Sequence, residues 1–370
     1  MLDLIGFTSI IFMSLLTLLL ALRHPKIFNV LFVALIVRVI LLILGEYFFD
    51  LPDSTADSRR YEKVAWENGK EGFLYVINQY EGPHARFISI LIAIPYSLFG
   101  RSVLMAKSLG LFFGIGSVFL GWKVSKLLWN DRIAKKIAWT IALFPSLILY
   151  SVIIMREVYL VFFLLLAIYG IVGWVKNDNF KSIIIALIGF FGATHFHGAM
   201  FVGAIVFLLF VGATSFKKSL VSLARFRFNV RIFLTFLLFV VFSTLYLSNK
   251  IQVSYLGTFE NSASTKELLR RSKTSTLGDA SFPKWLIANS TIELIYKAPV
   301  RSLYVVFAPF PWDVKKTKHL IGMFDAFLYM YLSVLILLNI KNIWKDPALR
   351  IILIILLAYI FVFGMGVGNF

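Results

Sequence analysis

Residues 27–61 read IFNVLFVALIVRVILLILGEYFFDLPDSTADSRRY, and this stretch decides the class of fold. Up to Phe49 it is almost entirely apolar, and its only charges are Arg38 and Glu46. A helix needs about 20 mostly apolar residues to cross a bilayer, so this part predicts a membrane span. The segment DSTADSRRY, residues 53–61, then brings carboxylates, arginines and a tyrosine together where the span leaves the membrane. The function of these polar side chains is the question that the sequence raises.

The apolar character extends over the whole chain of 370 residues, whose mean hydropathy is +0.85. Charged residues account for 15% of the chain, against about 25% in a typical soluble domain. Only α-helices and closed barrels satisfy their backbone polar groups in lipid, and the long apolar runs do not fit the short alternating strands of a barrel. The sequence therefore predicts an all-α, polytopic membrane protein, with residues 1–370 forming a single membrane domain.

The net charge of +18 and the absence of cysteine narrow the partners and sites. In a membrane protein, lysine and arginine first report topology and contact with anionic head groups, so we expect membrane lipids and no nucleic acid as partners. Without cysteine the chain forms neither disulfides nor thiolate metal sites. The first apolar run, residues 4–22, follows Asp3 rather than a basic leader, so it is interpreted as a span and not as a signal peptide.

Short basic connections indicate the order and orientation of the spans, because such connections stay on the cytoplasmic side. About ten spans fit between them by the length rule. The basic connections are residues 23–26, 123–136, 176–181, 217–231 and 341–350, and the spans lie near 4–22, 27–49, 102–122, 136–154, 158–174, 181–195, 198–214, 231–248, 321–340 and 350–368. We expect a multi-pass protein of the cytoplasmic (inner) membrane with both termini outside.

Two apolar segments, residues 87–99 and 300–311, are too short to cross and would reverse the orientation of the basic connections if they did. We expect both to lie along or dip into the outer surface as juxtamembrane or re-entrant helices. They belong to two long outer loops, residues 50–101 and 249–320, of which the first is acidic and the second basic. These loops are predicted to form a polar cap that carries an active site facing the exterior.

The polar segment after the second span has an ordinary explanation, since outer loops tolerate charge freely. Two features favour a functional role. Aromatic residues at positions 47–49 hold the helix end at the interface, so Asp53 and Asp57 are expected close to the membrane surface. Residues 60–70 have apolar positions at helical spacing and predict a short amphipathic helix on the bilayer. A carboxylate fixed there can reach a lipid head group, which suggests lipid-linked substrates.

The run Asp57-Ser-Arg-Arg-Tyr61-Glu-Lys-Val-Ala65 resembles the D-x-x-R-Y-x-x-x-A pattern that begins the first outer loop of the GT-C superfamily. These are membrane glycosyltransferases that use polyprenyl-phosphate-linked sugars. Residues 84–100 resemble the juxtamembrane helix and "LFG" turn of aminoarabinose and mannosyl transferases in that group, and residues 141–169 resemble its next hairpin. The chain departs from the pattern in an extra span before the acidic loop and in a second carboxylate that is not obvious beyond Glu62.

The resemblance implies a glycosyltransferase in which Asp57 is the acid/base or metal-binding carboxylate. Transfer from a phosphate-activated sugar also requires a base for the acceptor hydroxyl and cations for the leaving phosphate. Asp53 competes with Asp57 for the role of base, and Glu62 is the third catalytic candidate. The donor is a polyprenyl-phosphate-linked sugar, and the use of a divalent metal ion is left open.

Cations near the predicted outer surface are candidates for binding the donor phosphate. Arg156 and Glu157 stand between two apolar helices, where an arginine is costly unless it is paired or functional. A simple ion pair that closes the hairpin is the alternative explanation. Arg38 lies near the middle of its span and is expected to point inward, with Glu46 or a lipid phosphate as partner. We expect Arg38, Arg156 and at least one histidine to face the same outer cavity as Asp57.

His195 and His197 form an H-x-H pair beside glycines, and zinc binding, a phosphate or sugar contact and a plain polar turn are all open. The segment FAPFPWDVKKTKH, residues 307–319, suits either sugar stacking or interfacial anchoring. The predicted substrate- and phosphate-binding residues are Arg38, Arg59, Arg60, Tyr61, His84, Arg86, Arg156, Glu157, His195, His197, Arg301 and Trp312.

The leading hypothesis is a GT-C glycosyltransferase that uses a lipid-linked sugar donor and a glycan or glycolipid acceptor in surface polysaccharide assembly. An O-antigen or capsule repeat-unit polymerase or ligase is the alternative within the enzyme class. A lipid-linked oligosaccharide transporter is the alternative outside it. Transporters tend to carry interrupted helices and polar residues at the midplane, and here Arg38 is the main polar residue expected there.

Overall fold

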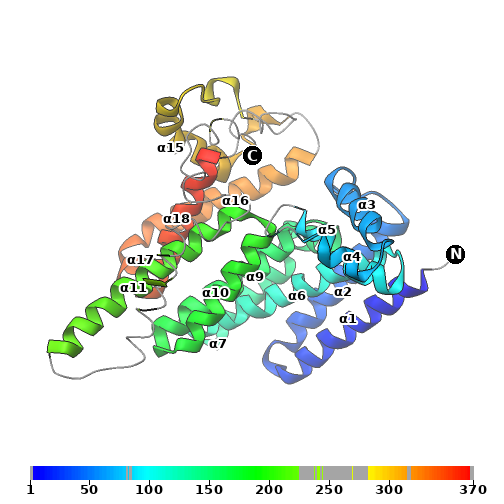
Figure 1. Cartoon of the computed structure of the whole chain (residues 1–370), viewed down its shortest axis with the longest axis horizontal. Coiled ribbons are helices and arrows are strands. Elements are labelled where there is room, and N and C mark those ends of the chain that lie inside the picture. Colours follow the sequence, from blue (N-terminus) through cyan, green and yellow to red (C-terminus); the bar gives the residue numbers. More distant parts are fainter. Residues whose placement is uncertain are drawn as a thin grey trace. The chain divides into compact units, whose positions relative to one another are not determined.

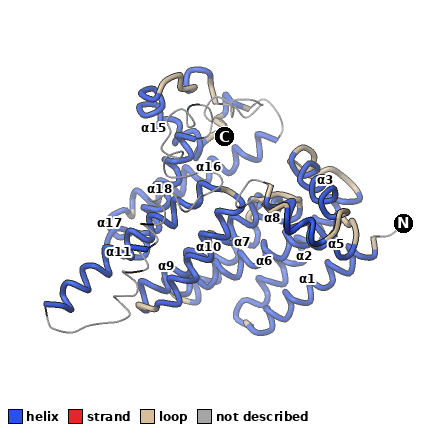
Figure 2. The backbone as a smooth tube through the Cα atoms, in the orientation of Figure 1, coloured by secondary structure: helices blue, strands red, loops and turns tan. Residues whose placement is uncertain are grey.

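The computed structural model describes residues 3–80, 82, 86–224, 237, 240, 241, 244, 269, 282–314 and 318–366. The regular elements in these ranges are all helices (Figure 2). The chain divides into two compact units, Met1–Gly198 and Ala199–Phe370, and each is described by itself. The prediction that both outer loops form one polar cap on a single domain stays a prediction.

The first unit is built from long apolar helices with three shorter helices inserted between the second and third of them (Figure 1). Short side-chain caps begin several of these helices, because the first N–H groups of a helix have no partner within it. Asp3 caps the first helix, with its carboxylate 2.8 Å from the Gly6 amide nitrogen. The helices are α1 (Leu4–Arg23), η1 (Pro25–Ile27), α2 (Phe28–Tyr47), α3 (Asp57–Gly69), α4 (Phe73–Asn78), α5 (Phe87–Phe99), α6 (Val103–Leu128), α7 (Asp131–Leu143), α8 (Pro145–Val152), α9 (Glu157–Asn177) and α10 (Phe180–Phe196), followed by η2 (Gly198–Met200).

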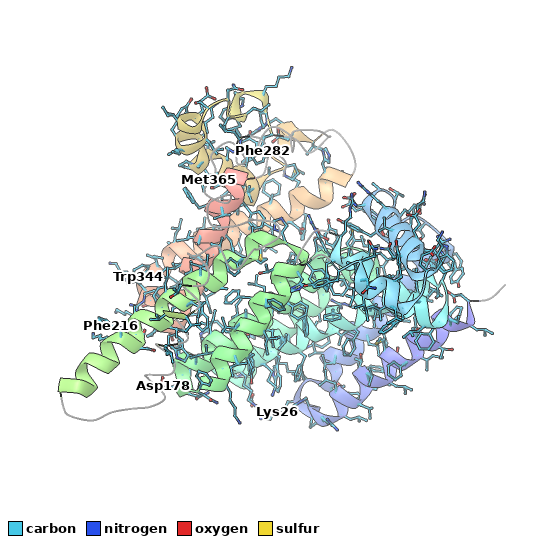
Figure 3. The ribbon with its side chains drawn as sticks, viewed as in Figure 1. Lys26, Asp178, Phe216, Phe282, Trp344 and Met365 are labelled. Carbon is cyan, nitrogen blue, oxygen red and sulfur yellow. The ribbon has the colours of Figure 1, made fainter. Side chains whose placement is uncertain are left out.

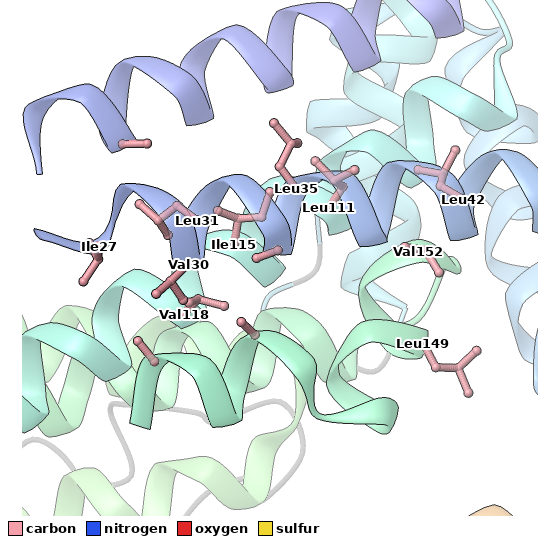
Figure 4. Packing of buried hydrophobic residues seen from close by; sticks show 14 of the residues in the cluster. Ile27, Val30, Leu31, Leu35, Leu42, Leu111, Ile115, Val118, Leu149 and Val152 are labelled. Atoms are coloured by element: carbon pink, nitrogen blue, oxygen red, sulfur yellow. The ribbon is translucent and has the colours of Figure 1, made fainter. Parts of the chain in front are cut away.

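The core of this unit lies where α2 packs against α6, α7 and α8. Figure 4 shows Val30 and Leu31 of α2 beside Ile115 and Val118 of α6, and all four side chains are buried. In a membrane protein, burial between helices is driven by close packing rather than by removal from water. The core therefore fixes the relative positions of the helices that carry the polar segments at their ends.

The connections of the first unit gather at two opposite ends. At one end, Asp131 forms ion pairs with Lys26 at 2.5 Å and with Lys126 at 3.3 Å, which joins the α1–α2 turn to the α6–α7 turn. At the other end, Ser102 donates to Asp3 at 2.5 Å and Tyr150 donates to Asp53 at 3.1 Å. Figure 3 labels Lys26 on the side of the unit away from α3, α4 and α5. The basic connections 23–26 and 123–136 thus meet at one end, and the start of the acidic segment lies at the other. Which side of the membrane each end faces stays a prediction.

The predicted spans agree with the structure in part. Among the described residues, six helices are long and apolar enough to cross a membrane, or seven if α7 and α8 count as one bent span. The predicted number of about ten is not confirmed. Predicted spans 181–195 and 321–340 correspond to shorter apolar helices, Phe180–Phe196 and Gly322–Leu338, and span 231–248 lies largely outside the described residues. The bounds of the short helix predicted at 87–99 are those of α5.

The predicted span 136–154 is broken, since α7 and α8 meet at an angle of 55°. Pro145 begins α8, and a proline inside a continuous helix would clash with the preceding turn and lack an N–H for it. The break frees the carbonyl of Ala142, which accepts a bond from Arg38 Nη1 at 2.9 Å. Arg38, on the neighbouring helix α2, thus provides a hydrogen-bond donor for the C-terminal end of α7.

Arg38 points inward as predicted, because its side chain is fully buried. The predicted partnership with Glu46 is wrong. Arg38 Nη1 donates to the carbonyls of Ala142 and Ala34, the latter at 3.2 Å, whereas Glu46 accepts a 2.6 Å bond from Lys107. A carbonyl freed by a helix break attracts the guanidinium because the C-terminal end of a helix carries a partial negative charge.

The second unit contains α11 and a group of helices from residue 284 onward, of which η3, α15 and η4 fall within the predicted outer loop 249–320. Its α15 packs against α18, where the Ser302 hydroxyl donates to the Ile360 carbonyl at 3.2 Å. The surface helix predicted at 300–311 begins earlier and ends sooner, because α15 continues unbroken from Ser290, which caps its first turn. The described helices are α11 (Phe201–Ala224), η3 (Lys284–Leu286), α15 (Thr291–Phe307), η4 (Pro311–Asp313), α16 (Lys318–Leu338), α17 (Ile340–Lys345) and α18 (Pro347–Gly366).

Candidate functional site

Helix α3 positions the candidate carboxylate Asp57, which is its first residue and is exposed. The buried face of α3 consists of Ser58, Glu62, Ala65 and Gly69, a spacing that follows the helical repeat. The amphipathic helix predicted over residues 60–70 is therefore present, but it starts at Asp57. This start gives Asp57 a fixed place at the helix N-terminus rather than in a loop.

Glu62 anchors α3 to the helices that follow it. Both of its oxygens accept bonds from Arg101, from Nε at 2.9 Å and from Nη2 at 2.8 Å, and the Tyr96 hydroxyl adds a third at 3.1 Å. The residue is only 7% exposed. A carboxylate that is buried and fully engaged is suited to holding the helix in place. We therefore assign Glu62 a positioning role and not the catalytic role that the sequence suggested.

Two serines fix α3 at further points. The backbone N–H of Ile154 donates to the Ser58 hydroxyl at 3.3 Å, which ties the start of α3 to the segment between α8 and α9. The Ser89 hydroxyl donates to the carbonyl of Tyr61 at 2.9 Å, which ties its second turn to α5. The face that carries Asp57 and Tyr61 is consequently held beside the start of α9.

Five predicted site residues come together there: Asp57, Tyr61, Arg156, Glu157 and His197, called the Asp57 cluster below. Arg156, Asp57 and Glu157 all lie close enough to Tyr61 to act on its ionisation. Arg156 Nε is 3.5 Å from Glu157 Oε1, and Arg156 also acts on His197. Arg156 and Asp57 thus both lie near Tyr61, and His197 lies near Arg156, whereas Arg38 lies at the α7–α8 break. That Arg156, a histidine and Asp57 face one outer cavity stays a prediction.

The environment of the cluster shifts the pKa values of Tyr61 and His197 in opposite directions. Burial raises the pKa of Tyr61, with Asp57 and Glu157 adding to the shift and Arg156 opposing it, so its hydroxyl is a hydrogen-bond donor at neutral pH. Burial and the charge of Arg156 lower the pKa of His197 to about 4, so its imidazole is neutral. Glu157 Oε2 is buried and has no hydrogen-bond partner among the described residues.

Asp53 differs from Asp57 in its backbone and its partner. Its φ of 58° lies in the left-handed region, which aspartate tolerates better than most residues because its side chain can bond locally. Its carboxylate accepts the bond from Tyr150 noted above. Asp53 therefore connects the segment before α3 to α8, and it is not part of the Asp57 cluster as defined.

The other predicted cations of the first loop lie outside the cluster. Arg59 pairs with Asp50 at 2.9 Å, and both side chains are 65% exposed. Arg60 and Arg86 are exposed, Arg60 on α3 and Arg86 at the start of α5. His84 lies outside the described residues. Of these residues, only Arg60 is placed near the Tyr61 hydroxyl.

His195 does not join His197 as an H-x-H metal pair. Its Nδ1 lies 2.8 Å from the carbonyl of Phe191, which can only accept, so Nδ1 carries the proton. Nε2 is then the acceptor for the Tyr80 hydroxyl at 2.5 Å. The Tyr80 ring stacks on His195, and Phe87 meets it edge to face. These contacts give His195 a structural role that links α10 to the segment after α4.

Arg301 and Trp312 belong to the second unit. Arg301 is fully buried, donates to Gly364 at 2.7 Å and Leu286 at 2.9 Å, and lies over the Phe282 ring. Trp312 is 72% exposed and stacks on Phe310. Arg301 thus holds α15 in place, while Trp312 offers an open aromatic surface. Their participation in the same site as Asp57 stays a prediction.

Two ion pairs near the candidate site were not predicted from the sequence. Lys107 and Glu46 form a largely buried pair at 2.6 Å between α6 and α2, and Arg101 holds Glu62. A single lysine near the start of an otherwise apolar helix was a usable signal, because an intramembrane charge requires a partner. The identity of the partner could not be read from the sequence, since these pairs join residues far apart in the chain.

No three His, Asp or Glu side chains among the described residues form a group that could hold a metal ion. The divalent ion allowed by the sequence argument stays a prediction. No family model, curated protein or solved structure matches the chain.

Proposed function

We propose that the protein is a GT-C type membrane glycosyltransferase that transfers a sugar from a polyprenyl-phosphate-linked donor. One observation carries the proposal: the exposed carboxylate of Asp57 stands at a helix start beside the cation Arg156, the hydroxyl of Tyr61 and a neutral His197. A base, a cation and neutral hydrogen-bonding groups are what transfer from a sugar phosphate requires. The acceptor is a glycan or glycolipid.

The residues of the Asp57 cluster and Arg60 have different roles in sugar transfer. Asp57 takes the proton of the acceptor hydroxyl as that oxygen forms a bond to the sugar C1. The bond between C1 and the phosphate oxygen breaks, and the polyprenyl phosphate leaves with the electron pair. Arg156 and Arg60 stabilise the developing phosphate charge, and the Tyr61 hydroxyl donates a further bond. Glu157 Oε2 is a free acceptor suited to a sugar hydroxyl.

The proposal includes a location, the cytoplasmic (inner) membrane with the cluster at its outer face, and a role in surface polysaccharide or glycolipid assembly. Basic connections at the opposite end of the first unit support this orientation. A repeat-unit polymerase or ligase would use the same bond chemistry with a longer donor.

The test compares Asp57→Asn with Asp53→Asn in liposomes that contain lipid-linked sugar. Asp57→Asn keeps the shape of the side chain and removes its basicity, so turnover should fall by about 10²–10⁴, the usual contribution of a positioned base. Donor binding should be retained, because arginine rather than Asp57 holds the phosphate. Loss of turnover in Asp53→Asn alone would move the catalytic role to Asp53, and normal turnover in both variants would contradict the transferase proposal.

A transporter of lipid-linked oligosaccharide is the second candidate, favoured by the broken helix α7–α8 with fully buried Arg38 at the break. Interrupted helices with polar groups at the break are common in transporters. The two functions differ in their products. A transporter would move labelled lipid-linked oligosaccharide across the liposome bilayer without forming a new glycosidic bond, and Asp57→Asn would leave that movement unchanged.

A further inference from the structure

The end of the first unit opposite the Asp57 cluster carries a second group of polar residues that sugar transfer does not use. It is formed by the α1–α2 turn, the C-terminal part of α6 and the first residue of α7. We call it the basic junction, and its residues are Arg23, His24, Lys26, Lys123, Lys126 and Asp131. Ion pairs from Asp131 to Lys26 and Lys126 hold its two segments together.

The basic junction has an excess of positive charge. Residues 22–26 and 122–131 contain four lysines and arginines and one carboxylate, Asp131. Since Asp131 already pairs with both Lys26 and Lys126, it neutralises at most one of the four cations. The next turns of α7 add Arg132, Lys135 and Lys136, which are exposed. An anion from outside the chain would complete the charge balance.

Aromatic rings fix the cations of the junction in place. Lys123 Nζ lies 5.4 Å from the centre of the Phe119 ring, and Lys126 Nζ lies 5.1 Å from that of Trp122. The His24 ring packs on the same two rings, at 4.9 and 5.6 Å. Trp122 is only 4% exposed, so these rings form a rigid floor under partly exposed cations.

The surrounding cations affect the pKa of His24. Burial, followed by the charges of Lys123, Lys126 and Arg23, lowers the pKa of His24. His24 is therefore neutral at physiological pH and can offer a hydrogen bond without adding charge. A bound anion would offset the three cations and raise the pKa of His24.

We propose that the basic junction binds the phosphate of an anionic phospholipid. A lipid is favoured over a free phosphate because the exposed leucines Leu15, Leu19 and Leu22 follow one side of α1 up to the junction. They offer an apolar surface for acyl chains directly beside the cations. Basic sites between membrane helices bind anionic head groups by this combination of charge and apolar contact. This site is separate from the Asp57 cluster and does not depend on the proposed function.

The test measures lipid binding to the purified full chain by native mass spectrometry, with phosphatidylglycerol and with phosphatidylcholine. Lys123→Gln/Lys126→Gln should weaken phosphatidylglycerol binding about 30-fold, since each surface lysine contributes about 1 kcal/mol. The control Lys135→Gln/Lys136→Gln removes the same charge from exposed positions on α7 and should change binding by less than about threefold. Phosphatidylcholine should bind weakly to all three proteins.

If both double variants lost the same affinity for phosphatidylglycerol, binding would depend on the total charge of this end and not on the basic junction, which would contradict the proposal. Competition by soluble glycerol phosphate at the same concentration as the lipid would also contradict the proposal, because it would show that the acyl chains contribute nothing. A second measurement requires no variant. The pKa of His24, followed by NMR, should rise when phosphatidylglycerol is added and stay constant with phosphatidylcholine, and the absence of a rise would count against a phosphate bound at the junction.

Discussion

Asp57 and Glu62 lie on the same short helix and have opposite environments. Asp57 is exposed at the first position, and Glu62 is buried one turn later with three hydrogen bonds. A carboxylate with free oxygens can accept a proton from a substrate, whereas the oxygens of Glu62 are already occupied by Arg101 and Tyr96 and are buried. The environment of each residue therefore separates the candidate base from the anchor, although both belong to the same sequence pattern.

Glu62→Gln should destabilise the protein, because the amide replaces a charged acceptor of the Arg101 bonds. We expect the free energy of unfolding to fall by about 1–3 kcal/mol, the range for a bond to a charged group, and turnover to fall with it because α3 carries Asp57. Thermal unfolding in detergent measures the first effect. Glu67→Gln is the matched control on α3, where the partner Lys63 is 3.9 Å away and both side chains are exposed, and it should change stability by less than about 0.5 kcal/mol. If Glu62→Gln and Glu67→Gln changed the free energy of unfolding equally, Glu62 would have no anchoring role.

His197 predicts a loss of stability at acid pH. Its pKa in the folded protein is about 4, below the ordinary value of about 6.5, so the unfolded chain binds the proton more tightly. Stability from the neutral imidazole is complete above about pH 6.5 and is lost as the pH falls towards 4, reaching a loss of about 2 kcal/mol at pH 5. Unfolding of wild type and His197→Gln at pH 7 and pH 5 measures this contribution. The variant should be less sensitive to pH by that amount, and an identical pH dependence in both would be inconsistent with the assignment.

At the scale of elements, glycines allow α9 and α10 to pack closely against each other. A Cβ atom built on Gly189 would lie 2.3 Å from the backbone nitrogen of Ala167, so the two helices approach closely only because the side chain is absent. A Cβ atom on Gly192 would lie equally close to Phe163, but to its ring. The ring can move and the backbone cannot.

Gly189→Ala should therefore destabilise the pair α9–α10 more than Gly192→Ala does. We expect a loss of about 2 kcal/mol for the first change, in the range for overpacking. The second should be close to neutral, because alanine favours the helix by about 1 kcal/mol. Thermal unfolding of the two single variants measures the difference. If Gly189→Ala lost less stability than Gly192→Ala, the two helices could move apart at little cost in free energy.

The elements also show how far sequence reasoning reaches. Apolar length predicted α1, α2 and α9 to within three residues at each end, because this signal is local. It missed the last six residues of α6, where Lys123 and Lys126 interrupt the apolar run. The break at Pro145 was not predicted, since a proline can bend or end a span and the choice depends on Arg38 reaching the freed carbonyl from another helix. In the site, Asp57 was identified from a local pattern, whereas the anchor Glu62–Arg101 and the pair Glu46–Lys107 depend on the tertiary fold.

At the scale of the whole molecule, the first unit is electrically asymmetric along its helices. The Asp57 cluster and the acidic segment lie at one end, and the basic junction lies at the other. Such an asymmetry orients a protein in the membrane, because positively charged connections are retained on the cytoplasmic side. The sugar-transfer proposal requires the Asp57 end to face outward, so the orientation can be tested independently of activity.

Single cysteines provide that test, because the chain contains none of its own. Thr55 lies on the Asp57 end and Lys135 on the basic end, and both side chains are exposed. In intact cells, a membrane-impermeant maleimide should label Thr55→Cys and leave Lys135→Cys unlabelled until the membrane is permeabilised, since cytoplasmic connections are reached only then. Unfolded protein is excluded by requiring that both variants retain the thermal unfolding of the wild type. Labelling of Lys135→Cys from outside would invert the topology and place the Asp57 cluster on the cytoplasmic side, where a donor at the outer face could not reach it.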